Sequence, residues 1–233
     1  MTPATVLLWD IDGTLLTTKR AGVFALEEAA RDVCGVSPDF ATLKTAGLTD
    51  HEVAMVALEA AGVEATPELA SRFLRSYESY LPDRLGLRDG GALPGVTEIL
   101  EHLKDRPDVL SLLLTGNTSA GAAAKLSHFG LSAYFTEGAF CMDGENRAQI
   151  ARRARALAAD LASEPIDPDR LYVIGDTPHD IRCGKEIGAR TVAVASGAYD
   201  LPALEAEHPW LALERLPPAE EFAARLLDGI ADR

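Results

Sequence analysis

The sequence has few cysteines, and they form no recognisable set. Only three occur among 233 residues, at Cys34, Cys141 and Cys183, and their spacing is not that of metal ligands. An odd number of scattered thiols argues against a disulfide-stabilised secreted fold and is typical of a reducing compartment. We therefore expect a cytoplasmic protein.

Positive charge and long apolar runs are also scarce. Lysine and arginine together number 22 against 36 acidic residues, giving a net charge of −14. Nucleic acids and anionic membranes attract proteins mainly through clustered Lys and Arg, so neither is an expected partner. The chain shows no basic-then-apolar leader and no run of about 18 apolar residues that could cross a bilayer. Nothing in the sequence indicates an oligomeric state.

Apolar residues nevertheless make up 47% of the chain, and four short apolar runs each stop at a polar or glycine residue. Continuous runs of this length are typical of strands covered on both faces. Helical patterns alternate with them, which predicts an α/β fold with a doubly wound, mostly parallel, Rossmann-like sheet. The expected strands are 5–9, 109–114, 171–174 and 191–195, with weaker ones near 134–140 and 210–213; the expected helices are 118–129, 147–161 and 178–187.

A long segment between the first two strands has only helical patterns, at 20–33, 50–61 and 67–81. It is too long for a simple crossover connection, so we predict an inserted domain. The predicted organisation is a catalytic core of residues 1–15 and 90–233 and a helical cap domain of residues 16–89.

Carboxylates follow two of the expected strands. Asp10 and Asp12 come directly after the first, where burial places like charges together at a cost unless a cation neutralises them. Asp176 follows the third strand, and Asp180 lies in the next helix, where it could also cap that helix after Thr177. Ligands of parallel sheets bind at the carboxyl ends of the strands. A hard divalent cation prefers such oxygen ligands, so this edge is a candidate metal site.

The second expected strand ends at Thr115, Gly116 and Asn117. A hydroxyl followed by glycine at a strand end can surround a phosphate with one side-chain donor and several backbone N–H groups. The alternative is that Asn117 or Thr118 simply caps the following helix.

These three stretches, in this order, resemble motifs one, two and four of the haloacid dehalogenase superfamily. The segment around Pro94 and the helical insertion after the first motif resemble its phosphoglycolate-phosphatase-like branch. The resemblance implies that Asp10 attacks phosphorus to form an aspartyl-phosphate and that Asp12 serves as general acid and base.

The resemblance also implies the ligands. Mg²⁺ would be held by Asp10, the backbone carbonyl of Asp12 and Asp176, with Asp180 alongside. The transferring phosphoryl group would be held by Thr115. The other residues expected to bind substrate near it are Gly13, Thr14, Gly116 and Asn117.

The superfamily places a cation, usually lysine, near the third strand, and this sequence has no lysine between Lys125 and Lys185. We predict that Arg147 takes this place, because it opens a helix after a glycine-containing loop. Lys125 lies about two turns along a helix that leaves the rim, so we expect its position to be remote. The alternative is that Arg147 is an ordinary solvated residue.

In the insertion, Leu48 and Thr49 lie in a segment that resembles a loop facing the active site and selecting the substrate. Thr49 also forms a capping box with Glu52, and the two roles are compatible.

The predicted function is a Mg²⁺-dependent phosphatase that hydrolyses a small phosphorylated metabolite. The substrate is expected to be small because a lid over the rim would exclude bulky ligands. The alternatives are a phosphomutase, which uses the same carboxylate pair, and a non-catalytic phosphate-binding or regulatory module. A dehalogenase needs no metal and would not keep Asp12 and Asp176. The sequence does not identify the ester.

Overall fold

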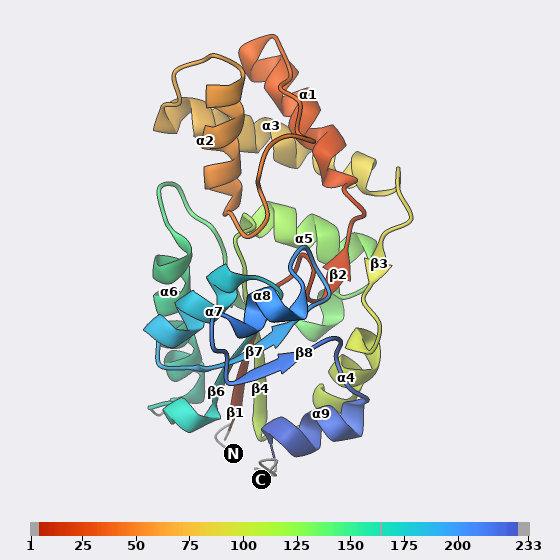
Figure 1. Ribbon diagram of the computed structural model, residues 1–233, viewed down its shortest axis with the longest axis vertical. Coiled ribbons are helices and arrows are strands. Elements are labelled where there is room, and N and C mark those ends of the chain that lie inside the picture. The colour runs from red at the N-terminus through yellow and green to blue at the C-terminus, as the bar shows by residue number, and fades with distance from the viewer. Residues whose placement is uncertain (1–4, 164, 228–233) are drawn as a thin grey trace.

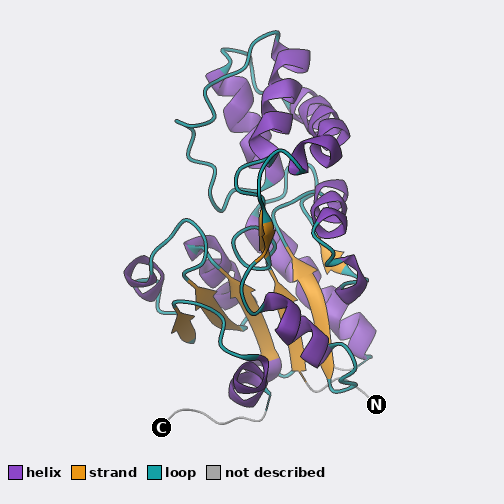
Figure 2. Cartoon of the chain, turned by 90° about the vertical axis from the view of Figure 1, so that its right-hand side faces the viewer, coloured by secondary structure: helices purple, strands orange, loops and turns teal. Residues whose placement is uncertain are grey.

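The computed structural model describes residues 5–163 and 165–227. Within them, six parallel strands form one sheet, at the base of the molecule in Figures 1 and 2. The order across the sheet is β5 (Gly138–Ala139), β4 (Val109–Leu114), β1 (Thr5–Trp9), β6 (Leu171–Gly175), β7 (Arg190–Val194) and β8 (Leu211–Leu213).

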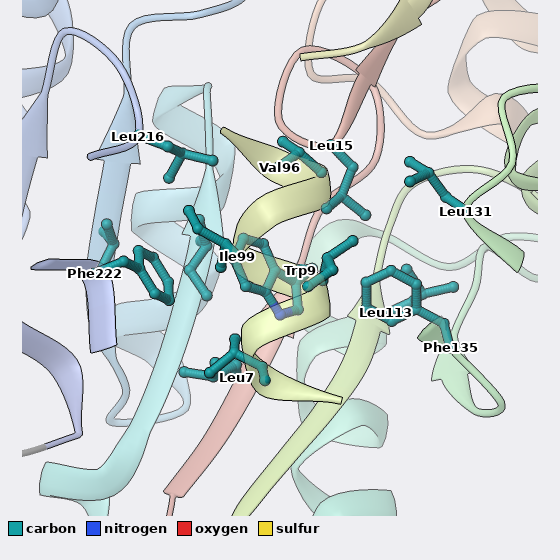
Figure 3. Packing of buried hydrophobic residues seen from close by; sticks show 14 of the residues in the cluster. Leu7, Trp9, Leu15, Val96, Ile99, Leu113, Leu131, Phe135, Leu216 and Phe222 are labelled. Carbon is teal, nitrogen blue, oxygen red and sulfur yellow. The ribbon is translucent and has the colours of Figure 1, made fainter. Parts of the chain in front are cut away.

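Helices cover both faces of this sheet because its strands alternate apolar side chains between two cores. Leu7 and Trp9 point into one apolar cluster, and Val6 and Leu8 into the other. Figure 3 shows the first cluster, in which the rings of Trp9 and Phe222 stack at 5.5 Å. Helices α4 (Val96–Leu103), α5 (Ser119–His128) and α9 (Ala219–Leu226) cover that face, and α6 (Arg147–Ala162) and α7 (Pro178–Glu186) cover the other. The predicted doubly wound α/β fold is therefore confirmed.

Three helices lie beyond the carboxyl ends of the strands and pack around an apolar cluster of their own. They are α1 (Gly22–Cys34), α2 (Asp50–Ala60) and α3 (Pro67–Leu85), and we call them the three-helix unit. Phe73, Tyr77 and Leu81 on α3 are buried in its core. The predicted limits of the cap and core domains stay a prediction, and residues 1–4, 164 and 228–233 of that core lie outside the described residues.

The segment 16–89 was expected to contain no strand, and this is wrong at its start. The short strands β2 (Leu16–Thr17) and β3 (Gly91–Ala92) pair in antiparallel fashion where the chain leaves and re-enters the core. Two residues are too few to show an alternating pattern, so this ribbon had no sequence signal. The weak strand expected near 134–140 is reduced to β5, because Ser132–Tyr134 form a 3₁₀ turn.

The short helix α8 (Leu201–Glu205) lies beside β7 and β8 near the edge of the sheet. Among the described residues, no helix combines the length and the apolar character that crossing a membrane would require.

Candidate active site

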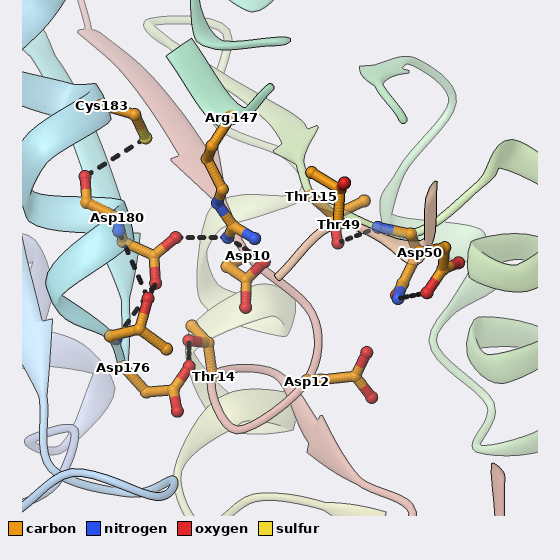
Figure 4. A network of polar contacts seen from close by, with 12 residues as sticks. Asp10, Asp12, Thr14, Thr49, Asp50, Thr115, Arg147, Asp176, Asp180 and Cys183 are labelled. Carbon is orange, nitrogen blue, oxygen red and sulfur yellow. Dashed lines mark hydrogen bonds and ion pairs between the residues drawn. The ribbon is translucent and has the colours of Figure 1, made fainter. Parts of the chain in front are cut away.

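The carboxyl ends of β1, β4 and β6 open into a cavity of about 550 Å³ that reaches the three-helix unit. Asp10 directly follows β1, Thr115 follows β4 and Asp176 follows β6, and all three line this cavity. Residues separated by more than 160 positions therefore meet at one edge of the sheet (Figure 4).

Arg147 joins two of the acidic residues. Its Nη2 atom donates to Oδ1 of Asp10 at 2.6 Å and also to Oδ1 of Asp180. The side chain is buried, so the alternative of a solvated arginine is wrong. Its place at the first residue of α6, after a capping box formed by Asn146 and Gln149, lets the guanidinium extend over the end of β1.

Asp180 is held from two sides. One oxygen accepts from Arg147, and the other accepts from the hydroxyl of Thr177 at 2.6 Å and from its backbone N–H at 3.1 Å. The expected capping box at the start of α7 is therefore present. A Cβ atom at Gly175 would lie 2.3 Å from Cγ of Asp180, so glycine is required for this approach. Asp180 thus both caps its helix and orients Arg147.

Glycines leave space around the carboxylate of Asp176. A Cβ atom at Gly13, whose φ of +84° favours glycine, would lie 2.4 Å from Oδ2 of Asp176, and one at Gly197 would lie 1.6 Å from it. The hydroxyl of Thr14 donates to Oδ1 at 3.4 Å, which places Thr14 beside the acid. The carboxylate of Asp176 thus occupies space that only glycine can leave at these two positions.

Asp10, Asp176 and Asp180 offer oxygen atoms that all lie within 4.8 Å of one another. Burial raises the pKa of Asp10 to about 7, with Asp180 adding to this effect and Arg147 opposing it. Burial and the nearby charge of Asp10 raise the pKa of Asp176 to about 8. This all-oxygen donor set is the one that Mg²⁺ prefers. The single guanidinium of Arg147 offsets only part of the charge of the three carboxylates, and a divalent cation would relieve the repulsion that remains between them. Asp12 was expected to bind the metal through its backbone carbonyl, and its carboxylate is not in this group.

Hydrogen bonds hold the loop after β4 in place but do not use all of its hydrogen-bond donors. The hydroxyl of Thr115 accepts from the backbone N–H of Asn117 at 3.2 Å, and Thr118 caps α5 through Gly121. Capping therefore belongs to Thr118, and Asn117 is not the cap. Thr115, Gly116 and Asn117 all line the cavity.

The expectation that α5 carries Lys125 away from the rim is wrong. Its Nζ atom lies 2.5 Å from Oδ2 of Asp12, and the lysine side chain is only 6% exposed. Helical rise places its Cα about 9 Å beyond the first residue of α5. However, a helical side chain points back toward the N-terminus, and the long lysine chain covers that distance.

The loop before α2 contacts the core. A Cβ atom at Gly47 would lie 2.6 Å from the ring of His179, and the backbone N–H of Asp50 donates to the carbonyl of Gly116 at 2.7 Å. Leu48 lines the cavity. Thr49 is buried and forms the expected capping box with Glu52, which occupies its hydroxyl. The two residues thus differ, because Leu48 lines the cavity and Thr49 does not.

Residues 7–185 match the family model of the haloacid dehalogenase-like hydrolases. The chain belongs to this family. A phosphoglycolate phosphatase of Synechococcus elongatus is 27% identical over 88% of this chain and 91% of that protein, and one of Agrobacterium fabrum is 25% identical over 86% and 84%. The hydrolase thus falls in the phosphoglycolate-phosphatase-like branch. A hydrolase structure from Pseudomonas syringae shares the fold, with 23% identity, a TM-score of 0.66 and coverage of 98% and 100%.

We expect the metal-free protein to lose stability as the pH rises from about 5 to about 8. The folded-state pKa values of Asp10 and Asp176 are about 7 and 8, whereas an unfolded chain has a value of about 4 for aspartate. Between these values the folded state binds more protons than the unfolded state, so raising the pH favours unfolding. Thermal unfolding in EDTA at pH 5 and pH 8 measures the effect.

The matched variant is Asp176→Asn, which removes one titrating group and its repulsion toward Asp10. Its Tm should be higher than that of the wild type at pH 8 and similar to that of the wild type at pH 5. An equal change in Tm with pH for both proteins would contradict this assignment of the charges.

Proposed function

We propose that this hydrolase is a Mg²⁺-dependent phosphatase that cleaves a small phosphate monoester through an aspartyl-phosphate on Asp10. The observation that carries the proposal is the buried carboxylate of Asp10 at the end of β1, held at 2.6 Å by Arg147 among carboxylates that need a further cation. The family and its phosphoglycolate phosphatase relatives support the same chemistry.

In the proposed first step, a carboxylate oxygen of Asp10 attacks phosphorus while the bond from phosphorus to the alcohol oxygen breaks. Asp12 gives its proton to that leaving oxygen. In the second step, Asp12 takes a proton from water, the water oxygen attacks phosphorus, and inorganic phosphate leaves as Asp10 is regenerated.

Several donors would hold the phosphoryl oxygens. Thr115 and the backbone N–H of Gly116 would supply uncharged donors. Gly13 and Asn117 also line the cavity, and Thr14 lies behind them against Asp176. Arg147 would supply the fixed positive charge. Its Nη1 atom would lie 3.0 Å from a Cβ atom at Gly116, so the guanidinium runs between Asp10 and this loop. A planar guanidinium suits phosphate oxygens.

The metal would be held by the carboxylates of Asp10 and Asp176 and the backbone carbonyl of Asp12, with Asp180 behind them. When bound, Mg²⁺ supplies positive charge that lets an anionic carboxylate approach an anionic phosphate. The short separation of the Asp10 and Asp176 oxygens, within 4.8 Å, supports this assignment.

We further propose that residues 16–89 act as a cap over the cavity. Leu48, Val53 and Tyr77 from this segment line it, and its volume of about 550 Å³ suits a small metabolite. Leu48 would contact the part of the substrate beyond the phosphate and so affect the choice of ester.

The general experiment is a screen of several dozen phosphate esters, with and without Mg²⁺, that measures released inorganic phosphate. Release of phosphate supports a phosphatase. Conversion of a sugar phosphate into its isomer without release would identify a phosphomutase, and inertness toward every ester would support a non-catalytic module.

Asp10→Asn should leave the fold intact and abolish turnover, because an amide cannot serve as the nucleophile. We expect kcat to fall at least about a hundredfold, or about 3 kcal/mol of barrier. The control is Asp105→Asn, which changes an exposed acid in the same way. Retention of more than about a hundredth of the wild-type kcat in Asp10→Asn would exclude Asp10 as the nucleophile.

Chelation should remove activity, and Mg²⁺ should restore it. Ca²⁺ should support the reaction poorly, because its larger and looser coordination spoils the alignment. Mg²⁺ should also raise the Tm of the wild type at pH 8, and Asp176→Ala should require a higher Mg²⁺ concentration for both effects. Unchanged metal titrations in Asp176→Ala would remove Asp176 from the site.

Arg147→Met should lower kcat/KM by at least about a hundredfold, or about 3 kcal/mol, because no other guanidinium contacts Asp10 within the described chain. The matched control is Arg152→Met, on the same helix but exposed and paired with Glu186. Similar kcat/KM values for the two folded variants would show that Arg147 does not serve the reaction.

A further inference from the structure

The carboxylate of Asp12 is held by a residue that the steps above do not use. Oδ2 of Asp12 accepts from Nζ of Lys125 at 2.5 Å, whereas no hydrogen bond from a described residue reaches Oδ1. The side chain of Asp12 is 43% exposed and that of Lys125 only 6%. One oxygen of the proposed proton donor is therefore fixed from the buried side, and the other remains available on the cavity side.

Lys125 lines the same cavity as two side chains of the three-helix unit, Asp50 and Tyr77. Asp50 on α2 and Tyr77 on α3 both act on its charge, although Lys125 belongs to the core helix α5. Burial alone would lower the pKa of Lys125, but Asp12, Tyr77 and Asp50 outweigh it and hold the pKa above its ordinary value. The ammonium thus stays charged between an acid of the core and an acid of the unit.

Asp50 is anchored at the same point of the core. Its Oδ2 atom accepts from the backbone N–H of Thr118 at 2.8 Å, and its Oδ1 atom accepts from the side chain of Asn117 at 3.4 Å. Its own N–H donates to Gly116. The N-terminus of α5 is therefore attached to α2, and α5 is the helix that carries Lys125.

We propose that Lys125 is a positioning residue for proton transfer: it holds Asp12 through Oδ2 so that Oδ1 faces the leaving oxygen of the ester. Asp50 binds the N-terminus of the helix that carries Lys125, and Asp50 and Tyr77 both approach this helix at Gly121, so the alignment of Asp12 depends on contact between the three-helix unit and the core. This inference rests on the proposed function. A proton donor gains its effect from alignment, which an exposed aspartate on a loop does not hold by itself.

The test compares leaving groups in Lys125→Met, which keeps a chain of similar length without the charge. The substrates are p-nitrophenyl phosphate, phenyl phosphate and an alkyl phosphate. Nitrophenolate leaves without needing a proton, whereas phenolate and above all an alkoxide need one. The quantity compared is kcat/KM, because it covers the steps up to alcohol release and omits the later attack by water, which all esters share.

In Lys125→Met, kcat/KM for the alkyl ester should fall by about a hundredfold, within the range of general acid catalysis. For p-nitrophenyl phosphate it should fall no more than about fivefold. The ratio of the two values should therefore change by at least about tenfold, with phenyl phosphate intermediate. The control is Lys104→Met, which removes an exposed lysine paired with Glu101 and should leave the ratio unchanged.

Removing the ammonium leaves Asp50 without its opposite charge, so Lys125→Met could be poorly folded. The double variant Lys125→Met, Asp50→Asn removes both charges, and the amide oxygen can still accept from Thr118. It should show the same change in ratio. Asp50→Asn alone should show a smaller change in the same direction.

An equal loss on all three esters, or no loss, in a folded Lys125 variant would overturn the inference and leave Lys125 as a structural ion pair. If the proposed function itself were wrong, the results would differ from these: the wild type would release no phosphate, or Asp10→Asn would stay active.

Discussion

The concentration of carboxylates at one buried edge of the sheet is the constraint on which the rest of the site depends. Oxygen atoms of Asp10, Asp176 and Asp180 lie within 4.8 Å of one another, and burial raises the pKa of Asp10 and of Asp176. Neighbouring features accommodate this charge. Thr177 and Arg147 satisfy both oxygens of Asp180, and Gly13 and Gly197 leave room for the carboxylate of Asp176. We expect a site built in this way to be more stable with a cation than without one, which would tie the fold to the chemistry.

The two buried cations divide the carboxylates between them. Arg147 contacts Asp10 and Asp180, and Lys125 contacts Asp12. Both cations come from helices that begin near the carboxyl ends of strands, but they reach the rim differently. Arg147 is the first residue of α6, whereas Lys125 is seven residues into α5 and reaches back along the helix. Separate cations can keep the proposed nucleophile and the proposed proton donor in different surroundings, although the two acids are two residues apart.

Much of this arrangement could be predicted from the sequence, because continuous apolar runs mark buried strands and the polar residues that end them meet at one edge. Arg147 could be placed from its position at a helix start. Lys125 could not, because an argument from helical rise locates the backbone and ignores the direction of a long side chain. The role of Asp50 could not be predicted from the sequence either. An acid in the first turn of a helix looks like an ordinary partner of the helix dipole, and only the tertiary contact to Thr118 gives it another role.

The contact through Asp50 bears on how the insertion and the core act together. A lid that only excluded water could close anywhere over the cavity. Here the backbone and the side chain of Asp50 both bind the loop after β4, which also carries Thr115. The residues proposed to hold the phosphoryl group, the helix that carries Lys125 and the loop that presents Leu48 are thus joined at one place. Movement of α2 away from the core would break these bonds together and remove Asp50 from Lys125. The proposed recognition of the substrate by the insertion and the proposed alignment of the proton donor in the core would therefore be physically linked.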